Sequence, residues 1–294
     1  MTNQEWKTWL RRGLIAGAPF LMNCGSSTGG NCGTHRVITF NEALPDAGSW
    51  DGGFSFQNCN ALCSSTTETC SLLDAGLLNC DRTCVGGRAP PGLFTLSNVD
   101  ASPGSWVARM AELEGAAVYA FSHLADELQA HGLKQFALYA LKAANQEVQH
   151  ARAITRLALG MGHCPTQRPI VATPVRTLEQ VAIDNAGEGC GRELFGALIN
   201  AHQAQTASSD DVRATMATIA VDERAHADFS FELARALMPK LTLAQRRRAR
   251  EAQHQALERL GNDDVPAVAR GVLGLMDGEQ LAAASRTLLQ TTRL

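Results

Sequence analysis

The chain has 294 residues, of which 45% are hydrophobic and 5% aromatic, enough apolar content to bury the core of one large domain or of two. Its 26 Lys and Arg residues against 29 Asp and Glu residues leave a formal net charge of -3, so the chain lacks the basic surplus of a nucleic-acid-binding protein. The low aromatic content, with runs of Ala, Leu, Gln and Glu, favours packed α-helices over a β-sandwich.

The N-terminal segment, 1–24, has the layout of an export signal. Lys7, Arg11 and Arg12 precede the apolar run GLIAGAPFLM, which Cys24 follows, so the pattern predicts a signal peptide that ends at a lipidatable cysteine of a cell-envelope protein. RRGLI is also similar to a twin-arginine export signal. Asn23 is unusual before a cleaved cysteine, and the alternative is an amphipathic N-terminal helix of a cytoplasmic protein. No segment reaches the ~20 apolar residues of a membrane span, so a lipid anchor is the most that the pattern implies.

A cysteine-rich segment follows at 25–85 and is rich in Gly, Ser, Thr and Asn. This composition predicts a small disulfide-rich cap, as an oxidising compartment favours. CNALC and CDRTC each place two cysteines four residues apart, on one face of a helix, so we expect two antiparallel helices bridged by disulfides. One of the many pairings that six cysteines allow is Cys59 with Cys84, Cys63 with Cys80 and Cys32 with Cys70. The alternative is a four-thiolate metal site, which usually has two-residue gaps.

A linker at 86–103, containing GGRAPPGL, leads into a periodic, Ala- and Leu-rich remainder. The apolar spacing predicts four long helices, over about 104–130, 134–161, 176–207 and 210–238. Short connections join the first helix to the second and the third to the fourth, whereas the middle connection is longer and contains three prolines. The pattern predicts an all-α four-helix bundle at 104–240 with one long crossover, followed by a helical extension at 241–294 that packs outside it.

Two of the predicted helices place a glutamate and a histidine three residues apart on an apolar face. Glu147 and His150 lie in AANQEVQHARAI, and Glu223 and His226 lie in TIAVDERAHADF. Apolar neighbours on the same faces predict that both pairs are buried, whereas a third copy, at 251–254, has polar neighbours and is expected on the surface. A buried carboxylate must be protonated, ion-paired or metal-bound, because leaving it charged and alone is costly.

Each of the other two helices supplies a candidate partner for these pairs. Glu114 lies on an apolar stripe of the first helix, and Glu112, about 200° around the helix from it, is the exposed alternative. In the third helix Glu188 shares a side with Leu178, and we favour it as the partner. Glu193, whose own face is also apolar, remains the alternative.

Four glutamates and two histidines should therefore converge between the helices. The predicted set is Glu114, Glu147, His150, Glu188, Glu223 and His226. Glutamates from two helices with a Glu-x-x-His from each of the other two form the ligand set of a pair of iron or manganese ions. Carboxylate oxygens suit iron, bridging carboxylates hold two cations close together, and one imidazole completes each metal. Four carboxylates also balance the charge of two divalent cations.

Polar neighbours of these pairs are candidates for orienting the histidines. Asp222 lies one turn from His226, and Gln146 lies one turn from His150. Either side chain could accept an imidazole N–H or reach the opposite histidine. Alternatively, both are ordinary polar residues at the edge of the bundle.

Small residues surround the third-helix glutamate. Gly187, Gly189 and Gly191 make room for a substrate or for a distorted backbone, or they allow tight helix packing. Cys190 is most simply a buried thiol, with redox chemistry or pairing with Cys164 as alternatives.

EGAAVYAFSHLADEL, NQEVQHAR, NAGEGCGREL and AVDERAHAD resemble segments of the ferritin-like di-iron carboxylate superfamily, as seen in rubrerythrins and related bacterial proteins. CVGGRAPPGL resembles the entry segment of bacterial ferritin-like-domain proteins with Cys-rich leaders, and the resemblance covers roughly 84–240. It implies a ferritin-like bundle in which the six residues of the predicted set bind two iron ions. Rubrerythrins also carry a rubredoxin-type centre with two-residue cysteine gaps, which this chain lacks, so an internal electron donor has no support.

The function expected from this site is that of an oxidoreductase of the oxidase, peroxidase or ferroxidase type. Two iron ions, two manganese ions or a mixed pair would react with O2 or peroxide, with an unknown organic substrate or electron donor as the other partner. The alternative is a non-catalytic metal-binding or structural envelope protein with the same bundle. A metal-free bundle is the third interpretation, although two histidines cannot neutralise four buried carboxylates.

Overall fold

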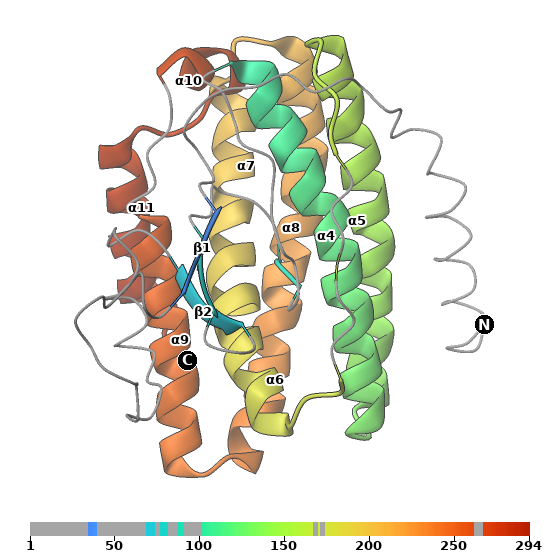
Figure 1. Ribbon diagram of the computed structural model, residues 1–294, viewed down its shortest axis with the longest axis vertical. Coiled ribbons are helices and arrows are strands. Elements are labelled where there is room, and N and C mark those ends of the chain that lie inside the picture. The colour runs from blue at the N-terminus through green and yellow to red at the C-terminus, as the bar shows by residue number, and fades with distance from the viewer. Residues whose placement is uncertain are drawn as a thin grey trace.

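The computed structural model describes three strands within 35–81, the segment 88–90, and residues 102–166, 170, 174–261 and 267–294. From residue 102 onward the described chain is helical (Figure 1). The predicted signal segment at 1–24, with its anchor at Cys24, lies outside the described residues, and so does most of the Cys-rich segment. Export of the protein and lipidation at Cys24 therefore remain predictions.

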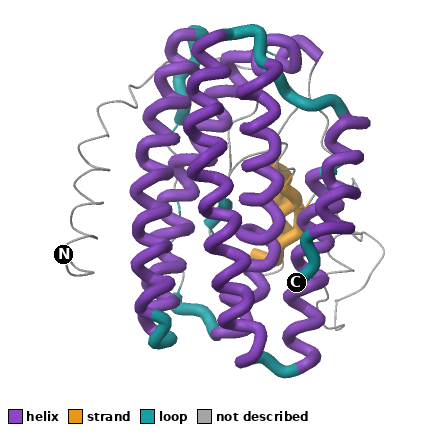
Figure 2. Tube along the Cα trace, turned by 180° about the vertical axis from the view of Figure 1, so that it is seen from behind, coloured by secondary structure: helices purple, strands orange, loops and turns teal. Residues whose placement is uncertain are grey.

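Four long helical stretches form a bundle in which neighbours run side by side (Figures 1 and 2). They are α4 (Pro103–Ala130), α5 (Lys134–Gly160), the composite stretch of α6 (Leu178–Asp184), η3 (Asn185–Glu193) and α7 (Leu194–Thr206), and α8 (Asp210–Leu237). Short connections at 131–133 and 207–209 join α4 to α5 and α7 to α8, whereas 161–177 links α5 to α6. The helical character of the bundle and its long middle connection are thus confirmed, whereas the third predicted helix, 176–207, is divided into α6, η3 and α7.

Side-chain caps define where several of these helices begin. Ser102 accepts the N–H of Ser105 at the start of α4, and Ser209 accepts that of Val212 at the start of α8. Thr177 and Gln180 form a reciprocal capping box at the start of α6. Each cap satisfies an N–H group that the first turn of a helix leaves without an intrahelical partner.

The C-terminal extension is helical and packs on the outside of the bundle, as predicted, but it is divided into several elements. These are η4 (Met238–Lys240), α9 (Leu243–Leu260), α10 (Ala267–Leu273) and α11 (Gly278–Thr291). Helix α9 packs along η3 and α6, and α11 packs against α9 and α7 (Figure 1). The extension therefore covers the third stretch of the bundle.

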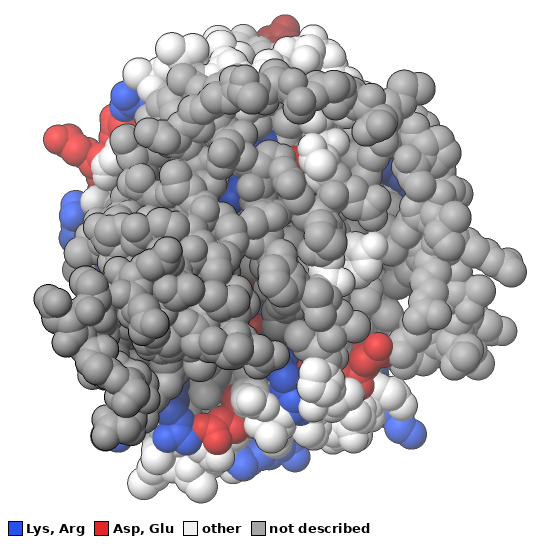
Figure 3. Space-filling model, in the orientation of Figure 1, with Lys and Arg blue, Asp and Glu red and all other residues white. Residues whose placement is uncertain are grey.

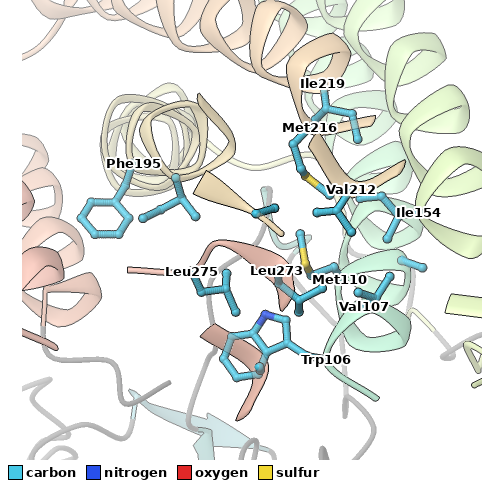
Figure 4. Close-up of a cluster of buried hydrophobic side chains, with 14 of the residues drawn as sticks. Trp106, Val107, Met110, Ile154, Phe195, Val212, Met216, Ile219, Leu273 and Leu275 are labelled. Atoms are coloured by element: carbon cyan, nitrogen blue, oxygen red, sulfur yellow. The ribbon is translucent and has the colours of Figure 1, made fainter. Parts of the chain in front are cut away.

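Two clusters of buried apolar side chains fill the bundle. The first joins side chains of α4, α5, α7 and α8 with the C-terminal extension, among them Trp106, Ile154, Phe195, Met216 and Leu273 (Figure 4). The second joins the other halves of α4, α5 and α8 with α6, among them Phe121, Leu141, Val181 and Leu233. Burial of these side chains is the main force that holds the helices together.

A short antiparallel sheet lies within the Cys-rich segment, where two helices were predicted. Its strands β1 (His35–Thr39), β2 (Thr69–Leu73) and β3 (Leu77–Asp81) pair in the order β1-β3-β2. Cys80 lies in β3 opposite Cys70 of β2, so the helix predicted over CDRTC is wrong for Cys80 and Asp81. A spacing of four fits one face of a helix, but it does not exclude a strand whose backbone groups pair with two neighbours.

None of the described helices is long and apolar enough to cross a membrane. Where the described surface is visible in Figure 3, acidic and basic side chains lie next to one another along its lower edge. That mixture agrees with the nearly balanced charge of the chain.

Candidate metal centre

A polar layer crosses the bundle between the two apolar clusters. On α4 the first cluster ends at Ala111 and the second begins at Val118, and on α8 the corresponding limits are Ile219 and Phe229. The layer contains six titratable side chains that are each at most 3% exposed. They are Glu114 of α4, Glu147 and His150 of α5, Glu193 at the end of η3, and Glu223 and His226 of α8.

The six side chains form two groups whose donor atoms lie within 4.8 Å of one another. The first cation position consists of Glu114, Glu147, His150 and Glu223. The second cation position consists of Glu147, Glu193, Glu223 and His226. Because both positions share Glu147 and Glu223, they lie side by side, and each could hold a metal ion.

Both imidazole rings turn Nδ1 toward the carboxylates of their own group, at distances of 3.0–3.8 Å. His150 Nδ1 lies 3.2 Å from Glu223 Oε1, and His226 Nδ1 lies 3.0 Å from Glu147 Oε1. The three-residue step within each Glu-x-x-His thus brings an oxygen and a nitrogen to one point between the helices.

Eight buried oxygen and nitrogen atoms of this layer, all of which could bind a cation, have no hydrogen-bond partner within the part of the chain that the structure describes. They are Glu114 Oε2, both carboxylate oxygens of Glu147, His150 Nδ1, Glu193 Oε2, both carboxylate oxygens of Glu223, and His226 Nδ1. Burying one such atom without a partner costs about 1–3 kcal/mol, and more when it carries charge. Eight such atoms in one layer require positive charge between them, which protons or metal cations could supply.

The outward nitrogens of the two histidines are held by a pair of side chains that bridge α5 and α8. His150 Nε2 lies 3.2 Å from Asp222 Oδ2, and His226 Nε2 lies 3.2 Å from Gln146 Oε1. The Gln146 amide in turn donates to Asp222. Because a carboxylate and an amide oxygen only accept, each Nε2 atom carries a proton, and Nδ1 of each ring faces the carboxylates and is the nitrogen that could bind a cation. The prediction that these residues reach the opposite histidine is confirmed.

Burial and mutual charge set the protonation of the metal-free layer. Burial, together with the charge of Glu147, raises the pKa of Glu114 to about 8, and burial with neighbouring carboxylates raises the pKa of Glu223. Burial also opposes ionisation of Glu147, but the two imidazoles outweigh it and lower its pKa. Burial opposes protonation of His150 and His226 too, yet the carboxylates raise the pKa of both. The raised pKa values of Glu114, Glu223 and both histidines favour protons in the metal-free layer, and bound cations would displace them.

The structure brings together five of the six predicted ligands and leaves Glu188 outside both groups. Glu193 is fully buried, and its Oε2 lies 3.7 Å from His226 Nδ1. The side chain of Glu188 is 25% exposed, and its Oε2 lies 3.2 Å from Nε of Arg192 and accepts the N–H of Ala89. The geometry therefore supports Glu193, the alternative, in place of the favoured Glu188.

The reason for this exchange is the π-helical geometry of η3. In a regular α-helix Glu188 would lie on the same face as Val181, because the two are seven residues apart. Glu193, five residues further, would point about 140° away from Glu188. The nine residues of η3 are instead π-helical, which changes the angle per residue and turns Glu193 inward. Gly187, Gly189 and Gly191, which are poor α-helix formers, were the sequence signal for this distortion.

The same glycines also allow close packing. A Cβ at position 191 would lie 2.9 Å from Cβ of Ala256 on α9, and one at position 189 would overlap Ser230 on α8. Both the distorted backbone and the tight packing considered for these glycines are therefore present.

Arg88 is a residue near the site that no sequence pattern indicated, because GGRAPPGL was interpreted as a linker and as an entry segment but not as part of the site. Its side chain is 1% exposed, and its backbone N–H donates to Glu193 Oε1 at 2.8 Å. Only the tertiary structure brings position 88 next to position 193.

Other candidates lie away from this layer. His254 is exposed and pairs with Glu258, so the third Glu-x-x-His is on the surface, as predicted. Glu112 is not exposed as expected: it is 8% exposed and accepts the N–H of Thr166 in the crossover. Cys190 is a free, buried thiol whose pKa burial raises to about 12, in agreement with the simplest interpretation.

Cys164 in the crossover is disulfide-bonded. Because Cys190 is free, pairing between these two cysteines is wrong.

No family model, curated protein or solved structure matches this chain. The chemistry of the site therefore rests on its own geometry. Carboxylate and imidazole donors, buried and without hydrogen-bond partners, fit hard or borderline divalent cations such as iron and manganese.

Proposed function

We propose that the bundle binds two transition-metal cations, iron in the first place, as a ferritin-like di-metal carboxylate protein. The observation that carries this proposal is the set of eight buried donor atoms without hydrogen-bond partners, divided between two groups that share Glu147 and Glu223. Four carboxylates and two neutral imidazoles balance two divalent cations in charge. Manganese or a mixed iron–manganese pair would use the same donors.

The reaction class that this centre supports best is oxidation by O2 or peroxide, as in an oxidase, peroxidase or ferroxidase. Bound iron would supply the electrons that reduce O2 or peroxide. The chain's own part is to supply a dry layer between two apolar clusters, to hold both imidazoles in one tautomer through Asp222 and Gln146, and to share two glutamates between the cations.

Anaerobic titration of the metal-free full chain with Fe2+ tests the proposal. We expect two iron ions per wild-type chain and none in Glu147→Ala or Glu223→Ala, because each of these residues belongs to both cation positions. Glu251→Ala is the matched control, since it removes the glutamate of the surface Glu-x-x-His copy and should leave both ions bound. A wild-type chain that binds no iron would exclude the proposal.

Admission of O2 or peroxide to the loaded chain then separates the two candidate functions. Consumption coupled to iron oxidation supports the oxidoreductase. Stoichiometric iron that consumes neither oxidant would establish the alternative, a metal-binding protein whose cations stabilise the bundle.

A further inference from the structure

The segment 88–90 contacts η3 next to the second cation position. Arg88 donates its backbone N–H to Glu193 Oε1 at 2.8 Å, and Ala89 donates its backbone N–H to Glu188 Oε2 at 2.9 Å. Two successive N–H groups thus hold two glutamates of η3. Of these glutamates only Glu193 belongs to a cation position.

The hydrogen bond from Arg88 makes the two carboxylate oxygens of Glu193 differ. Oε1 is occupied by the N–H of Arg88, whereas Oε2 has no hydrogen-bond partner in the described chain and lies 3.7 Å from His226 Nδ1. Because a carboxylate is planar, fixing one oxygen restricts the direction in which the other points. The Arg88 N–H therefore orients the oxygen that faces the second cation position.

The side chain of Arg88 reaches the same position from another direction. Its guanidinium carbon lies 5.3 Å from the ring centre of Phe121, and that ring lies 5.0 Å from the ring of His226. Nη2 of Arg88 anchors the guanidinium at 3.3 Å from Asp184 Oδ2. Attraction between the guanidinium and the Phe121 face keeps the aromatic ring against the imidazole.

We propose that Arg88 is a positioning residue for the second cation position, so that the segment preceding the bundle completes the metal centre. The inference rests on the proposed binding of two cations. Arg88 holds Glu193 directly and His226 through Phe121, the two donors that only the second position uses. Among the described contacts of 88–90 none involves Glu114 or His150, the donors that only the first position uses. Loss of Arg88 should therefore weaken the second cation and spare the first.

Titration of the full chain with Mn2+ tests this assignment, because two adjacent Mn2+ ions give a spin-coupled magnetic resonance signal and a single ion gives an isolated one. Arg88→Pro removes both the N–H and the side chain. We expect the second Mn2+ to bind about 10- to 100-fold more weakly and the isolated signal to replace the coupled one at low Mn2+. Arg88→Ala keeps the N–H and should show a smaller loss, which Arg88→Lys should partly restore.

Ala89→Pro is the matched control for the backbone. Residue 89 already precedes Pro90, so its backbone is already restricted to extended conformations, and its N–H binds Glu188, which lies outside both positions. This variant should keep both Mn2+ ions and the coupled signal.

The outcomes separate the two proposals. A wild-type chain that binds no Mn2+ and no Fe2+ would remove the metal centre itself. A wild-type chain with two Mn2+ ions, beside an Arg88→Pro chain that binds both equally well, would overturn only the role of Arg88. Equal loss of the second ion in Ala89→Pro would overturn it too, because the conformation of the segment and not the Arg88 N–H would then be responsible.

Discussion

At the scale of single residues, what distinguishes a candidate ligand is which partners its oxygens have. Glu188 and Glu193 are five residues apart and of the same type. Glu188, however, forms an ion pair with Arg192 and accepts the N–H of Ala89. Glu193 keeps one oxygen without a hydrogen-bond partner in the described chain. An acid that is already neutralised by a cationic side chain has less need of a metal.

Alanine substitution of each glutamate should separate their roles. We expect Glu193→Ala to lose the second cation or to bind it about 10- to 100-fold more weakly, because an oxygen donor disappears from that position alone. Glu188→Ala should keep both cations, since Glu188 lies outside both groups. Equilibrium dialysis with Fe2+ under argon measures both stoichiometries. The reverse result would return the ligand role to Glu188.

At the scale of elements, η3 decides which side chains face the cluster. Its π-helical turn places Glu193 inward, and its glycines let α8 and α9 approach the backbone. Gln253 of α9, which is buried, donates to the carbonyl of Cys190 in η3 at 3.3 Å. The extension thus supports the irregular element that carries a candidate ligand.

A side chain added at position 191 should disturb this contact. Gly191→Ala would bring Cβ to 2.9 Å from Cβ of Ala256, and a Cβ atom cannot move away by rotating its side chain. We therefore expect a loss of about 1–3 kcal/mol in the free energy of unfolding. Gly187→Ala is the control, because the nearest atom would lie at an ordinary 3.6 Å. Urea denaturation followed by circular dichroism measures both variants. Equal stability of the two variants would show that α9 does not press on η3 as described.

At the scale of the whole molecule, a partly buried ionic cluster joins the crossover to the bundle. Arg176, the last residue but one before α6, forms a two-bond pair with Glu127 of α4 at 2.7 and 2.8 Å. It also contacts Asp184 of α6 at 2.9 Å. Burial opposes ionisation of Glu127, but Arg176 outweighs it and lowers the pKa of Glu127 to about 2. The cluster therefore joins α4 to the third helical stretch where the chain crosses between them.

Removal of this carboxylate should destabilise the fold and change its acid sensitivity. We expect Glu127→Gln to cost about 3 kcal/mol at neutral pH, near the lower end for a broken buried pair, because Arg176 is partly exposed and keeps its contact with Asp184. Because the pKa of Glu127 is lower in the folded state, its ionised carboxylate stabilises the fold fully above pH 4.5. This stabilisation is lost as the pH falls toward about 2, so the difference in stability between Glu127→Gln and wild type should shrink across that window.

Thermal and urea unfolding at several pH values check this expectation. Glu179→Gln is the control, since its partner Arg248 is largely exposed and the pair should contribute little. A difference between Glu127→Gln and wild type that stays constant from neutral pH to about pH 2 would contradict the assigned pair.

The sequence by itself determined the helical bundle, its long middle connection and five of the six residues of the polar layer. Each of these follows from local periodicity, because residues three or four apart share one helix face and Glu147, His150, Glu223 and His226 lie on regular helices. The burial of Glu114 followed for the same reason.

Only the tertiary structure decided the rest. The choice of Glu193 depends on a π-helical turn that departs from the regular angle per residue, and the sheet within the Cys-rich segment depends on pairing between distant strands. The role inferred for Arg88 depends on a contact across 105 residues of chain. Periodicity carries no information about such contacts, because it describes one element at a time and they form only when elements pack.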